Sequence, residues 1–288
     1  MKSCEKNYAS DALLHGLSAV QKTPIIGLGQ KLKRPSEVLN METSHFVKNS
    51  RRDFLWIAGS GALLLVTSRL RAWAAPNSAP LKVGTIGAGH IGGTLGTMWM
   101  QSGHPVMFSS RHPDELKSLV DGLGPLAHSG SVQEAIVFGD VVLLAVPYRA
   151  MPQIGKDYGE ALATKVLVFD ATNPILARDG EIAPWALERG AGIASAELLP
   201  GVRLVRAFNA INYKKLPEAA RHQGERIGMP MAGNDANAIA VASSLVQEIG
   251  FEPVVIGSLA MGKYLIPGTP LAGEHTAQEI RQIAATLK

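Results

Sequence analysis

The stretch LKVGTIGAGHIGG, residues 81–93, decides the fold. Its apolar start predicts a short strand, and the next six residues fit the pattern G-x-G-x-x-G. This turn consists of Gly87, Ala88, Gly89, His90, Ile91 and Gly92. In dinucleotide-binding units the first glycine permits a tight turn, the second lets the backbone approach a diphosphate, and the third allows close helix–strand packing. The pattern also occurs in ordinary glycine-rich turns, but a strand before it and a helix after it indicate the start of a βαβ unit.

Short apolar runs then alternate with amphipathic stretches. Four of these runs read as strands: PVMFSS (105–110), DVVLLAVP (140–147), KVLVFDATNP (165–174) and VRLVRAFNAI (202–211). The continuously apolar Val141–Val146 is typical of a strand buried on both faces. Ser131 and Glu134 form a capping-box pattern that predicts the start of a helix between two of the strands.

The C-terminal part repeats this alternation. We expect a strand over Ile227–Ala232, a helix opened by Asn234 and closed by Gly250, and a strand over Glu252–Ile256. Strands alternating with helices predict an α/β fold, a Rossmann-like doubly wound parallel sheet. We assign residues 80–215 to a dinucleotide-binding domain and residues 216–288 to a small α/β domain on the substrate side.

The charge of the chain is unevenly distributed. The formal net charge is +4, but residues 1–74 carry 11 Lys and Arg against 5 Asp and Glu, and residues 75–288 carry 17 against 19. No basic patch with interleaved aromatic residues follows residue 75, so we exclude nucleic acid as a partner. The only cysteine is Cys4. The body therefore has no thiolate ligand to offer, and we expect no metal site.

The basic N-terminal part contains an export-like segment. Arg51 and Arg52 precede an uncharged run, Phe54–Ser68, which is shorter than the ~20 residues of a spanning helix. Ala72-Trp73-Ala74 then fits the small-x-small pattern of a signal peptidase site. The segment resembles a twin-arginine signal, so we expect residues 41–75 to direct export, to the periplasm or beyond, by the twin-arginine machinery. A chance arginine pair before a core helix and an uncleaved anchor are the alternatives. Residues 1–40 are either unstructured or precede a true start at Met41.

The second strand ends unusually for a dinucleotide-binding unit. An acidic residue normally stands about twenty residues after the glycine turn, where it binds a ribose hydroxyl. Ser109, Ser110 and Arg111 occupy this position instead. A guanidinium presents a planar fork that suits a phosphate, and a serine hydroxyl can donate to it. The sequence therefore predicts NADP(H) as the cofactor, unless Arg111 is merely a solvated loop residue.

The motifs GAGHIG, SSRHP, VVLLAVP, DATNP and RAFNAI, in this order, resemble the NADP oxidoreductases dependent on coenzyme F-420, a deazaflavin, over residues 81–259. The dinucleotide domain is also similar to those of pyrroline-5-carboxylate reductases and transmembrane ferric reductases. The resemblance implies that Ala88, Gly89, His90 and Ile91 bind the diphosphate, Ser110 and Arg111 the 2′-phosphate, and that Val146, Pro147, Asn173 and Pro174 lie at the nicotinamide end.

The predicted function is an exported NADP(H)-dependent oxidoreductase that transfers hydride to or from coenzyme F-420, a flavin or a small organic acceptor. The cofactor carries this chemistry, so no catalytic residue is named. Tyr148 and Asn209 are candidates for the acceptor pocket, and Asp170 either meets a ribose or ends a strand. Phe208 beside Asn209 also fits a core role. A non-catalytic NADP-binding or sensor subunit of a redox complex and an imine reductase resembling pyrroline-5-carboxylate reductase are the alternatives. A homodimer is compatible with the sequence.

Overall fold

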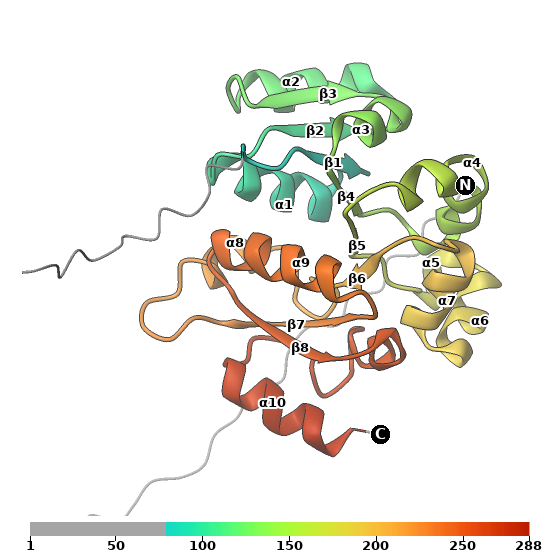
Figure 1. Cartoon of the computed structure of the whole chain (residues 1–288), viewed down its shortest axis with the longest axis vertical. Helices are drawn as coiled ribbons and strands as arrows, with labels where there is room; N and C mark the ends of the chain where they lie inside the picture. The colour runs from blue at the N-terminus through green and yellow to red at the C-terminus, as the bar shows by residue number, and fades with distance from the viewer. Residues whose placement is uncertain (1–78, 288) are drawn as a thin grey trace, which may run out of the picture. The chain divides into compact units, whose positions relative to one another are not determined.

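The computed structural model describes residues 79–287, and the export-like segment and residues 1–40 lie outside this part of the chain. The strands form an eight-stranded sheet with the order β3-β2-β1-β4-β5-β6-β7-β8 (Figure 1). Their bounds are β1 Val83–Ile86, β2 Val106–Ser109, β3 Ala127–Gly130, β4 Val141–Leu144, β5 Leu167–Asp170, β6 Leu204–Arg206, β7 Gly228–Gly233 and β8 Glu252–Gly257.

Helices follow most of the strands. Their bounds are α1 His90–Gln101, α2 Lys117–Asp121, α3 Val132–Phe138, α4 Met151–Ala163, α5 Leu176–Asp179, α6 Ile182–Arg189, α7 Ala191–Leu198, α8 Leu216–Ala219, α9 Ala236–Glu248 and α10 Ala277–Thr286. Short 3-10 turns, η2 Pro113–Leu116, η3 Tyr148–Ala150 and η4 Leu259–Tyr264, complete the connections. Three consecutive helices, α5 to α7, lie between β5 and β6, and the sequence patterns predicted none of them.

The predicted Rossmann-like fold is confirmed, with one reversal of direction. Strands β3, β2, β1, β4, β5 and β6 pair in parallel, whereas β7 pairs antiparallel to β6 and parallel to β8. The connection from β6 to β7 holds only the four-residue α8. This part of the chain reverses without a full crossover helix, which explains the antiparallel neighbour. Residues 216–287 thus extend the same sheet rather than building a second one.

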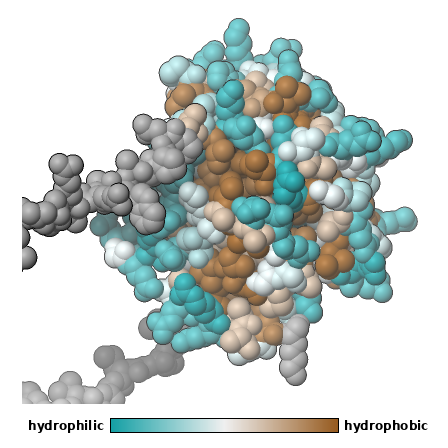
Figure 2. Space-filling view, in the orientation of Figure 1, coloured by the Kyte–Doolittle hydropathy of each residue, from teal (hydrophilic) through white to brown (hydrophobic). Residues whose placement is uncertain are grey.

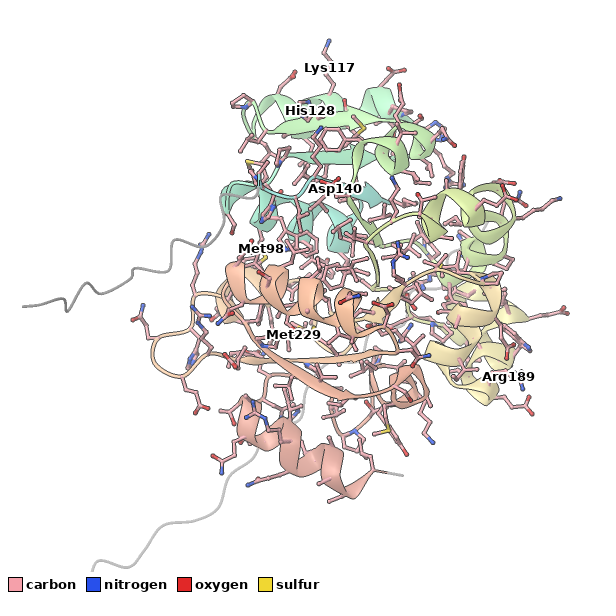
Figure 3. All side chains as sticks on the ribbon, viewed as in Figure 1. Met98, Lys117, His128, Asp140, Arg189 and Met229 are labelled. Atoms are coloured by element: carbon pink, nitrogen blue, oxygen red, sulfur yellow. The ribbon has the colours of Figure 1, made fainter. Side chains whose placement is uncertain are left out.

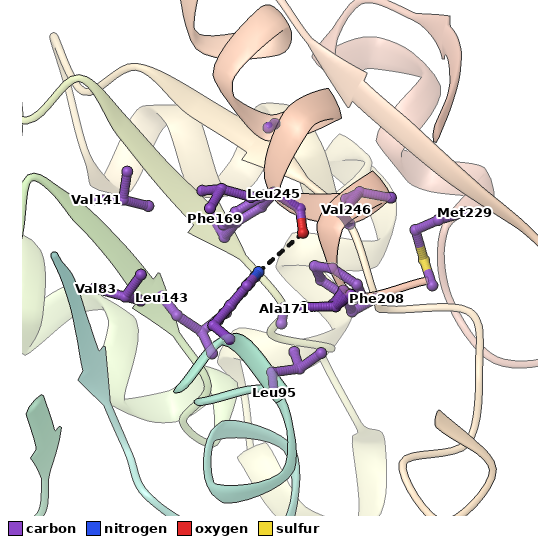
Figure 4. Packing of buried hydrophobic residues seen from close by; sticks show 14 of the residues in the cluster. Val83, Leu95, Val141, Leu143, Phe169, Ala171, Phe208, Met229, Leu245 and Val246 are labelled. Atoms are coloured by element: carbon purple, nitrogen blue, oxygen red, sulfur yellow. Dashed lines mark hydrogen bonds between the residues drawn. The ribbon is translucent and has the colours of Figure 1, made fainter. Parts of the chain in front are cut away.

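The core lies on both faces of the sheet, because parallel strands are covered by helices on either side. On the α1 and α9 face, the indole of Trp99 packs against the rings of Phe169 and Phe208, with centroid distances of 5.4 and 5.9 Å. The indole nitrogen of Trp99 donates to the carbonyl oxygen of Leu245 at 3.0 Å, the dashed line in Figure 4. This bond ties α1 to α9, and the helix that follows the glycine turn shares one core with α9 and β7.

Helix caps explain several element bounds. The predicted capping box is present: Ser131 accepts from the Glu134 amide, and the Glu134 carboxylate accepts from the Ser131 amide. A second one, Thr276 with Glu279, begins α10. Asn234 was expected to open α9, but Asp235 is its N-cap and accepts from the Ala238 amide. The strand AHSG, β3, was not predicted, because an edge strand with two exposed polar residues lacks an apolar signature.

The part of the chain that the structure describes contains no membrane-spanning helix. Between residues 79 and 287 no helix has both the length and the hydropathy to cross a bilayer. Hydrophobic side chains gather near the middle of the face seen in Figure 2, and hydrophilic side chains surround them.

Candidate functional site

The glycine turn joins β1 to α1 at the carboxyl edge of the sheet. Gly87 has φ +95°, and a Cβ there would lie 2.6 Å from the carbonyl oxygen of Ala145, at the end of the neighbouring β4. A Cβ on Gly92 would lie 2.1 Å from the carbonyl oxygen of Gly87. Both positions therefore require glycine, the first for conformation and close approach, the second for helix–strand packing.

Gly89 is different, because a Cβ there would meet nothing within 4 Å. It is the N-cap of α1 and supplies no side-chain hydrogen bond to the first turn. The amides of Gly87 and Ala88 donate to the carbonyl oxygen of Ser109 at 3.2 and 2.9 Å. The Ala88 amide is therefore used within the protein, and the predicted contact of Ala88 with a diphosphate stays a prediction. The first amides of α1, with the partial positive charge of the helix N-terminus, fit an anion.

The end of β2 presents a cation beside this turn. Ser109 is buried, and its hydroxyl donates to the carbonyl oxygen of Thr85 at 2.6 Å. The hydroxyl oxygen of Ser110 accepts from the amide of His112 at 3.1 Å. Arg111 is exposed, and its guanidinium makes no ion pair or hydrogen bond with any described residue. A free guanidinium thus lies at the position where a carboxylate would repel a 2′-phosphate.

Strand β4 ends against the glycine turn. Val146 lies next to Gly87, whose hypothetical Cβ would be 2.9 Å from a Val146 methyl group, and Pro147 is exposed. Tyr148 does not join them in an acceptor pocket, because it is fully buried and its hydroxyl lies 3.2 Å from the hydroxyl of Ser195. Burial raises the pKa of Tyr148 to about 12. The structure gives this tyrosine a packing role in place of the expected acceptor contact.

A buried polar network joins the ends of β5 and β6. The guanidinium of Arg206 lies 2.6 Å from the carboxylate of Asp170, and both side chains are 0% exposed. Asp170 also accepts from the amide and hydroxyl of Thr172, at 2.9 and 2.6 Å. Arg206 donates to the carbonyl oxygen of Thr172 at 3.1 Å and to that of Leu265 at 3.3 Å. Asp170 therefore ends its strand in an ion pair, which is one of the two roles considered for it.

The turn after β6 is strained and partly unsatisfied. Phe208 has φ +67°, the only non-glycine residue with positive φ among those described. Such a conformation costs roughly 1–3 kcal/mol. The Phe208 ring is buried against Trp99, Phe169 and Phe251, which holds the turn in place. The adjacent Asn209 is 3% exposed, and its side-chain oxygen has no hydrogen-bond partner in the described chain.

Asn173 and Pro174 follow β5 and meet this turn. The amide nitrogen of the Asn173 side chain donates to the main-chain oxygen of Asn209 at 2.9 Å. Asn173 is half-buried and Pro174 is buried. The expected nicotinamide-end residues Val146, Pro147, Asn173 and Pro174 thus follow two adjacent strands, β4 and β5, whereas Ser110 and Arg111 follow β2 on the other side of β1.

Two features of the site were not predicted. One is the Asp170–Arg206 pair, although opposite charges at the ends of two apolar runs, LVFD and LVR, were a signal that could have found it. The other is the stacking of the His90 ring on the Tyr213 ring, with centroids 4.6 Å apart and an interplanar angle of 11°. It connects the glycine turn to the loop between β6 and α8, and nothing in the local sequence indicates it.

A groove of about 910 Å³ starts at the glycine turn and runs along α1 to α8 and the end of α9. Met98, labelled in Figure 3, lies on α1 and lines the groove, as do Ala220 and Ile249. The groove shares Ala88, Gly89 and His90 with the turn. Its lining includes none of the other predicted cofactor residues after the strands, which are Ser110, Arg111, Val146, Pro147, Asn173 and Pro174. Nor does the described chain hold a group of three or more His, Cys, Asp or Glu residues that could bind a metal ion.

Residues 82–174 match the family described as NADP oxidoreductase coenzyme F420-dependent. The metalloreductase STEAP3 of Rattus norvegicus is 30% identical over 188 residues, which cover 65% of this chain and 36% of that protein. The chain therefore aligns with little more than a third of this relative. The matches support an oxidoreductase-type domain that uses a nicotinamide dinucleotide.

Solved structures agree on the fold. A hypothetical protein from Sinorhizobium meliloti is 27% identical, with a TM-score of 0.59 over 68% of this chain and 95% of its own. A protein named as a candidate F420-dependent NADP-reductase from Arthrobacter sp. FB24 is 19% identical, with a TM-score of 0.51 over 64% of this chain and 87% of its own. At that identity the second likeness concerns the fold alone.

Proposed function

We propose that this protein is an exported NADP(H)-dependent oxidoreductase that transfers hydride between the nicotinamide and an organic acceptor such as a flavin or a deazaflavin. The observation that carries the proposal is the pairing of two anion sites at one edge of the sheet. The open N-terminus of α1 follows β1, and the free guanidinium of Arg111 follows the adjacent β2. Together they suit a diphosphate and a 2′-phosphate.

The residues present fit this cofactor. The first-turn amides of α1 would hold the diphosphate, and Arg111 with Ser110 would hold the 2′-phosphate. Because β4 and β5 lie on the opposite side of β1 from β2, the nicotinamide end would lie toward Val146 and Asn173. When bound, the cofactor supplies the hydride chemistry. The protein binds the cofactor, orients it and excludes water from the reacting ring.

The cofactor preference is tested by Arg111→Asp. The substitution removes a charge-assisted contact and adds repulsion, so the affinity for NADPH should fall about 10- to 100-fold while that for NADH stays nearly constant. Lys117→Asp is the matched control, because Lys117 is exposed on α2 and undergoes the same charge change (Figure 3). Equal weakening of both cofactors by Arg111→Asp would refute the phosphate role.

Turnover separates an enzyme from a non-catalytic NADP-binding subunit. The absorbance of reduced NADPH should decay when flavin, deazaflavin, quinone or ferric acceptors are added in turn to the purified protein. Oxidation by one class of acceptor would identify the substrate. Tight binding of NADPH without oxidation by any of them would favour the sensor or subunit reading, and reduction of a cyclic imine would favour the imine-reductase reading.

A further inference from the structure

We propose that the side-chain oxygen of Asn209 accepts a hydrogen bond from the carboxamide N–H group of the nicotinamide, so that Asn209 is a specificity residue for the cofactor's reactive end. The inference rests on the proposed function, because it assigns a role within the same dinucleotide site. It changes the expectation from the sequence, in which Asn209 contacted the acceptor.

The orientation of the Asn209 amide is fixed by its neighbours. Its side-chain nitrogen donates to the carbonyl oxygen of Thr172 at 2.8 Å, and only the nitrogen can make that bond. The oxygen is therefore the end left over, and it can only accept. Buried polar groups are almost always satisfied, so a buried acceptor without a partner among the described residues calls for a donor that these residues do not supply.

The turn that carries this oxygen is held from several sides. The Phe208 ring is locked in the aromatic core, and the main-chain oxygen of Asn209 accepts from Asn173. Arg206, which is paired with Asp170, also donates to the Thr172 carbonyl oxygen. A strained residue persists only where its surroundings determine it, and such residues gather at binding sites. The free oxygen is thus positioned in advance, as a specific hydrogen bond to a ligand requires.

The sheet order identifies the part of the ligand. If the diphosphate lies at the turn after β1 and the adenosine lies toward β2, the other half of the dinucleotide extends over the ends of β4, β5 and β6. Asn209 follows β6, three residues after its end. The primary carboxamide of nicotinamide supplies two N–H donors. It therefore matches an isolated acceptor in this part of the edge.

The test compares NADP⁺ with its 3-acetylpyridine analogue, in which a methyl ketone replaces the carboxamide and no N–H donor remains. Binding is measured by titration calorimetry, so no turnover is needed. The unsubstituted protein should bind NADP⁺ about tenfold tighter than the analogue, the worth of one good hydrogen bond. In Asn209→Leu this preference should disappear. Asn209→Ala removes the same oxygen with a smaller side chain, should the leucine variant fail to fold.

Two controls separate the possible failures. Asn212→Ala, an exposed residue of the same loop, should keep the tenfold preference. Adenosine 2′,5′-bisphosphate, which lacks the nicotinamide half, should bind the original protein and both Asn209 variants equally. If this fragment does not bind the original protein, the proposed NADP site itself fails. If it binds but the original protein treats NADP⁺ and the analogue alike, or the variants keep the preference, only the role of Asn209 is overturned.

Discussion

Arg206 and Asp170 form an ion pair of 2.6 Å between two neighbouring strands, and water reaches neither side chain. The same guanidinium bonds to the carbonyl oxygens of Thr172 and Leu265, so it connects β5, β6 and the segment after η4. Gly192 and Gly262 make room for it, since a Cβ on either would lie 3.2 or 2.7 Å from the Arg206 Cδ atom. The fold is built closely around this one charged side chain.

Removing one partner of this pair should destabilise the protein strongly. Arg206→Met leaves the Asp170 carboxylate buried without its counter-ion, and we expect a loss of about 3–5 kcal/mol in the free energy of unfolding. The double variant Arg206→Met with Asp170→Asn should lose less than the sum of the two single losses. Urea denaturation of the four proteins measures this coupling, and purely additive losses would contradict it.

Two substitutions in the glycine turn should have separate effects, one on stability and the other on cofactor binding. Gly92→Ala places a Cβ 2.1 Å from a backbone oxygen, so we expect a loss of roughly 1–3 kcal/mol in stability. Gly89→Ala meets no atom within 4 Å and should fold with a stability close to the original. Its methyl group would occupy the approach to the first-turn amides, so the affinity for NADP⁺ should fall tenfold or more. Denaturation and NADP⁺-binding titrations on both variants test this. Unchanged affinity of Gly89→Ala for NADP⁺ would refute the proposal that the diphosphate binds at this turn.

Tyr148 should make stability depend on alkaline pH. Its pKa is raised from 10.0 to about 12 by burial, so the folded state keeps a proton that the unfolded state loses. The contribution of Tyr148 to the free energy of unfolding is complete below pH ~10. It is lost as the pH rises toward 12, by about 1.4 kcal/mol per pH unit between these limits. Unfolding followed between pH 9 and 11 should show this decline, and Tyr148→Phe should lack it. Tyr158 is a half-buried residue of α4, and it serves as the control. The stability of Tyr158→Phe should decline with rising pH as that of the original protein does.

The export proposal concerns residues outside the described part of the chain and depends on Arg51 and Arg52. The twin-arginine pathway recognises the arginine pair itself and not only its charge. Arg51→Lys with Arg52→Lys should therefore trap the precursor inside the cell, whereas Lys48→Arg, a nearby change of the same size, should not. Cell fractionation followed by immunoblotting checks this, and normal delivery of the double-lysine variant would reject the signal.

Local patterns predicted the frame of the site well. The strand-turn-helix at residues 81–93, the apolar strand Val141–Leu144 and the Ser131–Glu134 cap all depend on neighbours close in sequence. The binding roles proposed for the glycine turn and for Arg111 rest on local patterns of the same kind and stay predictions. Patterns of this kind report backbone conformation and burial, and for that reason they could predict an α/β sheet with a dinucleotide turn at its carboxyl edge.

The partners of the polar side chains at that edge were decided only by the tertiary structure. Tyr148 looked like a pocket residue because it follows a buried strand, but its side chain turns into the core and reaches Ser195, 47 positions away. The pairing of Asp170 with Arg206 and of Asn209 with Thr172 spans 36 and 37 positions. Local sequence patterns cover only a few neighbouring residues, so they cannot identify partners that lie this far apart in the chain. Local sequence patterns thus determined which backbone turns and charges lie at this edge, because they depend on neighbouring residues. Three-dimensional packing decided which polar groups are already hydrogen-bonded and which have no partner among the described residues.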